Sequence, residues 1–311
     1  MDRVATSTAY GTMLANLMAS EVRQTIAGDQ LSSTKVANDL KGFGANSETL
    51  VALQTTNNQV SGYLAQTQQI ASKLSIQDQA LNQVASAAQS ASLSISNAIA
   101  TGNGDLLMAS LQNQFQSAVQ GLNTTFNGEY IFSGGQVTTQ PVSSTQLSDL
   151  TAGTIPGQFH NDQQQLTSNL DGSTTINSGF LADQVGTPLF TAFQSVEAYV
   201  QANGPFTGQL TPAQTAFLSG VVTSFNAADT QLNDTTGQNG QMQAQVTTAQ
   251  SALTQRQTML GGLISNITDV NLAQASTDLQ QAQLSVQAAG QVFNSLKAAS
   301  LLNTLTSTGI P

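Results

Sequence analysis

The only histidine of the chain, His160, lies two residues before Asp162 and is the first candidate for chemistry. A histidine beside a carboxylate can act as a general base, because the carboxylate orients the imidazole ring. The rest of a catalytic arrangement is not visible, since the sequence shows no second histidine, no cysteine and no converging group of acids. We therefore interpret His160 as a solvated loop residue, and we keep a surface hydrolase that uses it only as an alternative.

Two further patterns lack the remainder of a ligand site. Gly102 and Gly104 are not a phosphate loop, because no strand precedes them and no lysine follows; they are typical of a helix end, with Asp105 as a possible cap for the next helix. Asp229 and Asp234 are an isolated acidic pair, which is usually solvated rather than ligating. The absence of cysteine excludes a disulfide framework and a thiolate metal site. The sequence predicts no enzyme, no cofactor and no metal.

The clearest periodic pattern is an apolar seam in a helix predicted from about Asp269 to Leu305. Its members alternate at steps of four and three residues: Ala275, Leu279, Ala282, Val286, Ala289, Phe293 and Leu296. This spacing is typical of a coiled coil. At a rise of about 1.5 Å per residue, the helix would be roughly 55 Å long and would need a partner of matching length.

Partner helices are predicted in the first third of the chain. The same alternation returns between Leu50 and Ile99. Polar residues interrupt this second seam at four positions: Asn57, Thr67, Asp78 and Ser92. A further apolar stripe near the N-terminus predicts a first helix that ends at about residue 32: Tyr10, Leu14, Leu17, Met18 and Val22. The fold class is therefore mainly α, a long antiparallel coiled-coil or helical bundle built from the N- and C-terminal segments.

The helical period disappears in the middle of the chain, where Thr, Ser, Gly and Asn dominate, and a small β or irregular insertion is expected there. Thr187-Pro188 and Thr211-Pro212 each predict the start of a short helix, and residues 237–240 predict a polar turn.

The sequence therefore predicts a division of the chain into five parts. They are residues 1–46, an N-terminal assembly helix and hinge; 47–130, the first half of the bundle; 131–186, an exposed β-rich insertion; 187–268, the second half of the bundle; and 269–311, a C-terminal assembly helix.

Charge divides the chain in the same way. All seven basic residues lie in the terminal parts, with none between Lys73 and Arg256, whereas that middle holds ten acidic residues. Nearly neutral ends can pack against copies of themselves, and an acidic middle keeps copies apart and argues against nucleic acid as a partner. No run approaches the ~20 apolar residues of a transmembrane helix, so we expect no membrane insertion. No cleaved signal is recognisable, so any export would use another route.

The terminal seams can form an intramolecular core, an assembly surface between subunits, or both. Two terminal helices alone could not fully cover these seams, so we predict an assembly surface and ends that become ordered on assembly. Its predicted members are Leu14, Leu17, Met18, Leu279, Val286, Phe293 and Leu296.

Three segments resemble the flagellin superfamily. Leu31-Ser-Ser-Thr-Lys35 with Asn38-Asp39 resembles the segment after the first helix of that family, although Thr34 stands where the family often has glycine. The segment from Ala275 to Leu305 resembles its C-terminal helix. Asn127-Gly-Glu-Tyr-Ile-Phe-Ser-Gly134 is similar to a signature of the hook-associated members, and its candidate residues are Tyr130, Ile131, Phe132 and Gly134.

The resemblance covers about residues 1–135 and 240–311, and it implies a structural subunit of the bacterial flagellum. It implies type III export with a chaperone, and assembly outside the cell with other copies, other hook-associated proteins and flagellin. The expected function is the junction between hook and filament. A filament flagellin is an alternative, and a secreted coiled-coil tip or adhesin protein of a type III system is an alternative of another class.

Overall fold

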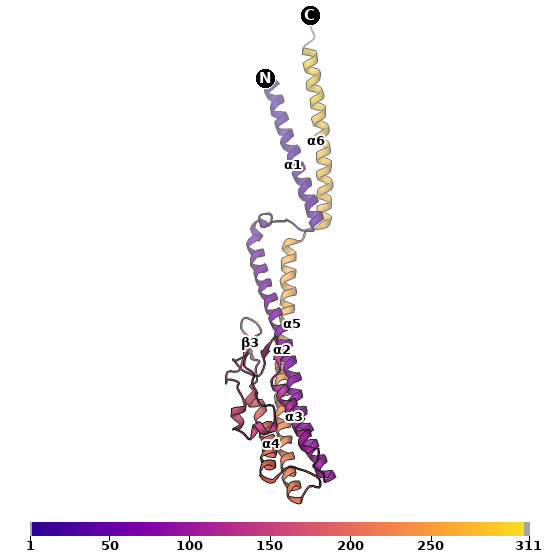
Figure 1. Cartoon of the computed structure of the whole chain (residues 1–311). Helices are drawn as coiled ribbons and strands as arrows, with labels where there is room; N and C mark the ends of the chain where they lie inside the picture. The colour runs from indigo at the N-terminus through magenta and orange to yellow at the C-terminus, as the bar shows by residue number, and fades with distance from the viewer. Residues whose placement is uncertain (1, 308–311) are drawn as a thin grey trace. The chain divides into compact units, whose positions relative to one another are not determined.

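The structure is a computed structural model that describes the backbone of residues 2–307 and the side chains of residues 8, 10–295 and 297–298. Six α-helices dominate this part of the chain (Figure 1): α1 Asp2–Ser33, α2 Ser47–Thr101, α3 Leu107–Leu122, α4 Ala182–Asn203, α5 Pro212–Thr268 and α6 Leu272–Ser307. The mainly α prediction is confirmed. No described helix combines the length and the apolar character that a membrane-spanning segment requires.

The strands are short and form two separate antiparallel pairs. They are β1 Thr125–Phe126 with β2 Glu129–Tyr130, and β3 Thr167–Asn169 with β4 Thr175–Asn177. Three 3₁₀ helices complete the described elements: η1 Leu40–Asn46, η2 Leu147–Leu150 and η3 Ile155–Gln158. The segment between α3 and α4 is therefore a small β and irregular insertion, as its composition predicts.

The chain divides into two compact units, one of residues 1–59 with 257–311 and one of residues 60–256. We call them the terminal unit and the middle unit. The terminal unit joins the two ends of the chain, and α2 and α5 each contribute to both units. The five-part division predicted from the sequence stays a proposal about the roles of these segments.

In the terminal unit, α1 and α6 lie side by side and run in opposite directions (Figure 1). The least exposed positions of α1 alternate at three and four residues: Tyr10, Met13, Leu17, Ser20, Gln24, Ala27 and Leu31. On α6 the least exposed described positions include Ala275, Leu279, Ala282, Val286, Ala289 and Phe293. These two rows, which we call the inner seam, have the periodicity of a coiled coil.

In the middle unit, α2, α3, α4 and α5 enclose one large apolar core. Phe115 contacts Phe193 edge-on with ring centroids 5.5 Å apart, and Phe193 contacts Phe225 in the same way at 4.8 Å. Leu170 and Ile176 of the β3–β4 hairpin belong to a second, smaller cluster with residues of α2 and α5. The insertion is therefore held against the helices by its own apolar side chains.

The two Thr-Pro pairs turn out differently. Pro212 begins α5 as predicted, with Thr211 Oγ1 accepting a hydrogen bond from the Gln214 amide at 3.2 Å. The predicted start at Thr187-Pro188 is wrong, because α4 begins at Ala182 and contains Pro188. A proline inside a helix leaves the carbonyl four residues earlier without its usual donor. Here that carbonyl, of Gln184, accepts a bond from Gln231 Nε2 at 3.5 Å.

Two other local predictions are corrected. The polar turn expected at residues 237–240 is absent, since α5 continues through it. Asp105 does not cap α3, whose cap position is Leu106. The Asp105 carboxylate instead accepts a hydrogen bond from the amide of Gly208 at 2.6 Å, which ties the α2–α3 loop to the α4–α5 loop. The second correction comes from a contact between residues that are about 100 positions apart in the sequence.

Candidate assembly surface

The inner seam is closed within the chain. Ser20 and Ala27 of α1 and Ala275 and Ala282 of α6 are buried. Nearer the chain ends, the rings of Tyr10 and Phe293 meet edge-on at 83° with centroids 5.7 Å apart. Most of the fully buried members are small, so α1 and α6 approach closely while burying little apolar area.

A second apolar row on α1 faces away from this seam. Leu14, Met18, Val22 and Ile26 recur every four residues, and each is about half exposed or more. At 3.6 residues per turn, the centre of this row lies about 150° around the helix from the centre of the inner seam. Within the described part of the chain, no neighbouring helix covers this row to the extent that α6 covers the inner seam.

A corresponding row lies on the outer side of α6. Leu284, with 66% of its surface exposed, is followed at steps of four by Ala288 and Val292, which are also exposed. The centre of this row is about 140° around the helix from the inner seam. We call the two rows together the outer stripes, and they lie on opposite sides of the α1–α6 pair.

The residues predicted as an assembly seam are divided between these surfaces. Leu14 and Met18 lie on an outer stripe, whereas Leu17, Leu279, Val286 and Phe293 lie on the inner seam. Leu296 lies outside the described side chains. Sequence reasoning missed Ile26, Leu284 and Val292. Their spacing was a usable signal, because Ile26 follows Val22 by four residues, and Ala288 lies four residues from both Leu284 and Val292.

Exposed large apolar side chains are concentrated in the terminal unit. Of the thirteen in the described part of the chain, eleven belong to that unit, and the middle unit has only Leu93 and Leu106. The terminal unit carries five basic and seven acidic residues, and the middle unit two basic and ten acidic. Lys73 is one of the two basic residues of the middle unit, and burial lowers its pKa although the nearby Glu129 opposes the shift. The apolar surface therefore coincides with the nearly neutral unit.

The Tyr130–Gly134 motif lies inside the middle unit. Ile131 and Phe132 are buried, and the Phe132 carbonyl accepts a bond from the amide of Ala182 at the start of α4. Gly134 has φ of +67°, and a Cβ there would lie 2.1 Å from Asp162 Oδ1, so only glycine fits. The motif joins the end of α3, the insertion and α4. Its use as a junction signature stays a prediction.

The candidates for chemistry do not come together into a catalytic arrangement. His160 Nε2 bonds the hydroxyl of Ser143 at 2.9 Å, whereas the Asp162 carboxylate accepts bonds from the amides of Gly135 and Gln164 at 2.9 Å each. The alternative pairing of His160 with Asp162 is thus not among the hydrogen bonds of the described residues. Within the described residues, no group of three or more His, Asp or Glu side chains could hold a metal ion.

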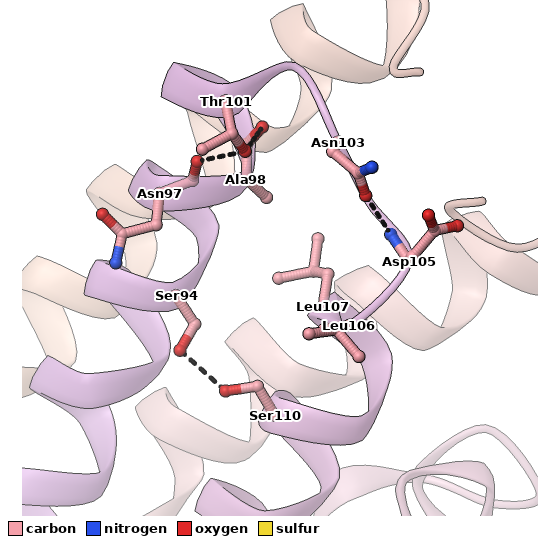
Figure 2. Close-up of a pocket in the computed structure, with 9 residues that line it drawn as sticks. All are labelled: Ser94, Asn97, Ala98, Thr101, Asn103, Asp105, Leu106, Leu107 and Ser110. Atoms are coloured by element: carbon pink, nitrogen blue, oxygen red, sulfur yellow. Dashed lines mark hydrogen bonds between the residues drawn. The ribbon is translucent and has the colours of Figure 1, made fainter. Parts of the chain in front are cut away.

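The pocket between the end of α2 and the start of α3 has a volume of about 560 Å³ (Figure 2). Its polar groups bond one another: Ser94 contacts Ser110 at 2.8 Å, and Asn103 Oδ1 accepts a bond from the amide of Asp105 at 2.8 Å. Leu106 at its edge is 80% exposed. These contacts hold the end of α2, the connecting loop and the start of α3 together, and they provide neither a nucleophile with its base nor a charged ligand set.

Comparison with known proteins relates the N-terminal part of the chain to a protein family. Residues 4–137 match the family described as the bacterial flagellin N-terminal helical region. The match spans α1, η1, α2, α3 and the β1–β2 hairpin. Residues 4–137 are therefore similar to a flagellin N-terminal region, and the N-terminal part of the resemblance to the flagellin superfamily is confirmed. No curated protein matches the chain.

Two solved structures share the fold. A putative flagellar hook-associated protein from Vibrio parahaemolyticus has a TM-score of 0.59 and 14% identity, over 72% of this chain and 97% of that chain. FlgL from Bacillus cereus has a TM-score of 0.53 and 13% identity, over 70% of this chain and 100% of that chain. The chain thus combines a flagellin-type N-terminal region with the fold of flagellar hook-associated proteins.

Proposed function

We propose that this chain is a structural subunit of the bacterial flagellum with the role of hook-associated protein 3, the junction between hook and filament. The observation that carries the proposal is the pair of outer stripes on α1 and α6. They are unpaired apolar surfaces on the terminal helices of a chain with a flagellin-type N-terminal region. Their role is to pack against the same helices of neighbouring subunits.

Burial of the outer stripes contributes free energy to such packing. A large apolar side chain contributes roughly 1.5–3 kcal/mol when it is fully buried. Leu14, Met18, Val22 and Ile26 are each about half exposed, so each has about 1 kcal/mol still to gain, or about 4 kcal/mol for the stripe on α1. A subunit that uses both stripes gains this at each of two contacts, before the entropic cost of association is subtracted.

The placement of the stripes favours continued assembly over a closed dimer. They lie on opposite sides of the α1–α6 pair and differ in sequence, so a contact between the α1 stripe of one copy and the α6 stripe of the next is heterologous. Heterologous contacts generate rings or helical arrays, because each added subunit leaves a free stripe. The nearly balanced charge of the terminal unit keeps repulsion between copies low, whereas the acidic middle unit would resist close packing.

The proposed partners follow from this role. They are other copies of the chain, other hook-associated proteins and flagellin in the assembled structure, and an export chaperone before assembly. Residues 1–46 and 269–311 are the assembly segments, and the chain acts outside the cell after type III export. A filament flagellin uses the same surfaces, so location along the flagellum separates the two functions.

Immunogold labelling of isolated flagella with an antibody against residues 136–235 tests the location. A single band of label at the hook end supports the junction role. Label along the whole filament would make the chain a flagellin, and no label on flagella would favour the secreted coiled-coil alternative.

A pair of matched variants tests the surface. Met18 on the α1 outer stripe and Leu93 in the middle unit are 56% and 57% exposed, so each can accept a carboxylate without a buried charge. We expect Met18→Asp to abolish incorporation into flagella, and Leu93→Asp to leave it intact. Equal incorporation of both variants would contradict the proposed surface. Export of both into the medium is the control for secretion.

A further inference from the structure

Two short linkers of the terminal unit are tied to each other. One connects α1 to η1 and contains Thr34, Lys35 and Val36, and the other connects α5 to α6 and contains Asp269 and Val270. The amide of Val36 donates to the carbonyl of Thr268 at 2.8 Å, and the amide of Val270 donates to the carbonyl of Thr34 at 3.1 Å. These two bonds make an antiparallel bridge between residues more than 230 positions apart.

Side chains reinforce this bridge. The ammonium group of Lys35 forms an ion pair with the carboxylate of Asp269 and donates to Thr268 Oγ1 at 3.3 Å. The same carboxylate accepts bonds from the hydroxyls of Ser265 and Thr268. Together these contacts lower the pKa of Asp269 to about 2, with the bond from Lys35 as the largest cause. We call the backbone bridge and the Lys35–Asp269 pair the linker clasp.

The inner seam alone defines the alignment of α1 and α6 weakly. Its buried members are small, and small side chains form shallow knobs that fit neighbouring holes nearly as well after a slip. The one aromatic contact of the seam, between Tyr10 and Phe293, lies far from the linkers. Tyr10 precedes Lys35 by 25 residues, and Phe293 follows Asp269 by 24 residues. The chain length from the linker clasp to the aromatic contact is therefore nearly the same along α1 as along α6.

We propose that Lys35 and Asp269 are positioning residues that fix the register of α1 against α6, and with it the relative position of the two outer stripes. A slip of one helical turn would move one stripe along the other by about 5.4 Å. Neighbouring copies could then not engage both stripes in the same register. This consequence for assembly rests on the proposed function, but the register itself does not.

Disulfide trapping in the full chain can measure the register, because the natural sequence has no cysteine. The pair Tyr10→Cys with Phe293→Cys reports the register seen here, and Tyr10→Cys with Ala289→Cys reports a shift of about one turn. The cysteines also replace the aromatic contact, so the clasp becomes the main anchor. The measured quantity is the ratio of the two disulfide yields under the same mild oxidation.

Charge reversal then tests the clasp. We expect Lys35→Glu and Asp269→Lys each to lower this ratio by at least about threefold, the factor that an exposed ion pair of ordinary strength provides. The double reversal, which restores an ion pair, should restore the ratio. Lys41→Glu is the matched control, since it reverses another exposed lysine near the linkers and should leave the ratio unchanged.

Unchanged ratios in both single variants would overturn the proposal. A double variant no better than the single ones would also overturn it, because the effect would then be local unfolding and not loss of pairing. Either failure is separate from failure of the proposed function, which depends on where the chain is found on flagella and not on disulfide yields.

Discussion

Replacement of Asn239 by alanine should destabilise the middle unit through the loss of a buried amide pair. Asn239 of α5 and Gln77 of α2 have no exposed surface. Gln77 Nε2 donates to Asn239 Oδ1 at 3.0 Å, and Asn239 Nδ2 donates to the carbonyl of Leu74 at 3.0 Å and to Asp78 Oδ1 at 3.3 Å. These hydrogen bonds connect α2 and α5 inside the middle unit.

The expected effect follows from what the substitution leaves behind. In Asn239→Ala, the Gln77 amide stays buried without an acceptor, and its Oε1 already has no hydrogen-bond partner within the described part of the chain. An unpaired buried donor costs about 1–3 kcal/mol, and the small cavity adds to it, so we expect a loss of about 2–3 kcal/mol. The same substitution at Asn226, an exposed amide of α5 that accepts a bond from the buried hydroxyl of Ser92, should cost only about 1 kcal/mol, because a single hydrogen bond is lost and no cavity forms.

Urea unfolding of the full chain, followed by circular dichroism, measures both losses. A third variant with leucine at both Gln77 and Asn239 removes the two amides together, so we expect it to be more stable than Asn239→Ala, because no unpaired group remains. The reasoning is refuted if Asn239→Ala and Asn226→Ala differ by less than about 0.5 kcal/mol. It is also refuted if the double leucine variant is the least stable of the three.

Four further predictions concern other parts of the molecule. Phe293→Ala should lower the free energy of unfolding by about 2 kcal/mol, roughly half the loss expected for a fully buried ring. It should also block incorporation into flagella without preventing export. The stability difference between the natural chain and Asp269→Asn should be constant above about pH 5 and be lost as the pH falls through the lowered pKa of about 2, because the folded chain stabilises the charged carboxylate. Gly121→Ala places a Cβ 2.7 Å from Val84 Cγ2 and should lower the unfolding free energy by about 1 kcal/mol, whereas Gly220→Ala, with open space around it, should raise it slightly. Hydrogen exchange should be fast in α1 and α6 of the free subunit and slow after assembly, and strong protection of both helices in the monomer would contradict this.

The inner face of α6 could be predicted from the sequence because its apolar members are spaced regularly and include leucine, valine and phenylalanine. The inner face of α1 could not be predicted in the same way. Its row contains Ser20, Gln24 and Ala27, which carry little hydrophobic signal, so the larger Leu14 and Met18 dominated the pattern. Periodicity identifies the face with the largest side chains, and in a thin helical pair that face can be the one turned outwards.

Long-range contacts explain the features that sequence reasoning could not supply. Gly237 and Gly240 indicated a turn, but the buried bonds of Asn239 to α2 keep α5 helical across them. The Lys35–Asp269 pair joins two linkers from opposite ends of the chain, and local sequence contains no signal for such a pair. Composition and period therefore predicted the helices and an apolar surface on the terminal segments, and the role of that surface in assembly stays a proposal. Tertiary hydrogen bonds decide where the helices break.

The α1–α6 pair has the properties of an element completed by its neighbours. Its buried members are small, and its larger inner residues, such as Leu17 and Val286, are only partly buried. Isolated helical pairs with so little apolar burial are marginal in water, because the burial term barely offsets the entropy of ordering both helices. The outer stripes carry the larger apolar side chains of the pair, and their surface is still exposed. Under the proposed function, the free energy that orders the terminal helices is mostly obtained between subunits, which would link folding of the chain ends to assembly.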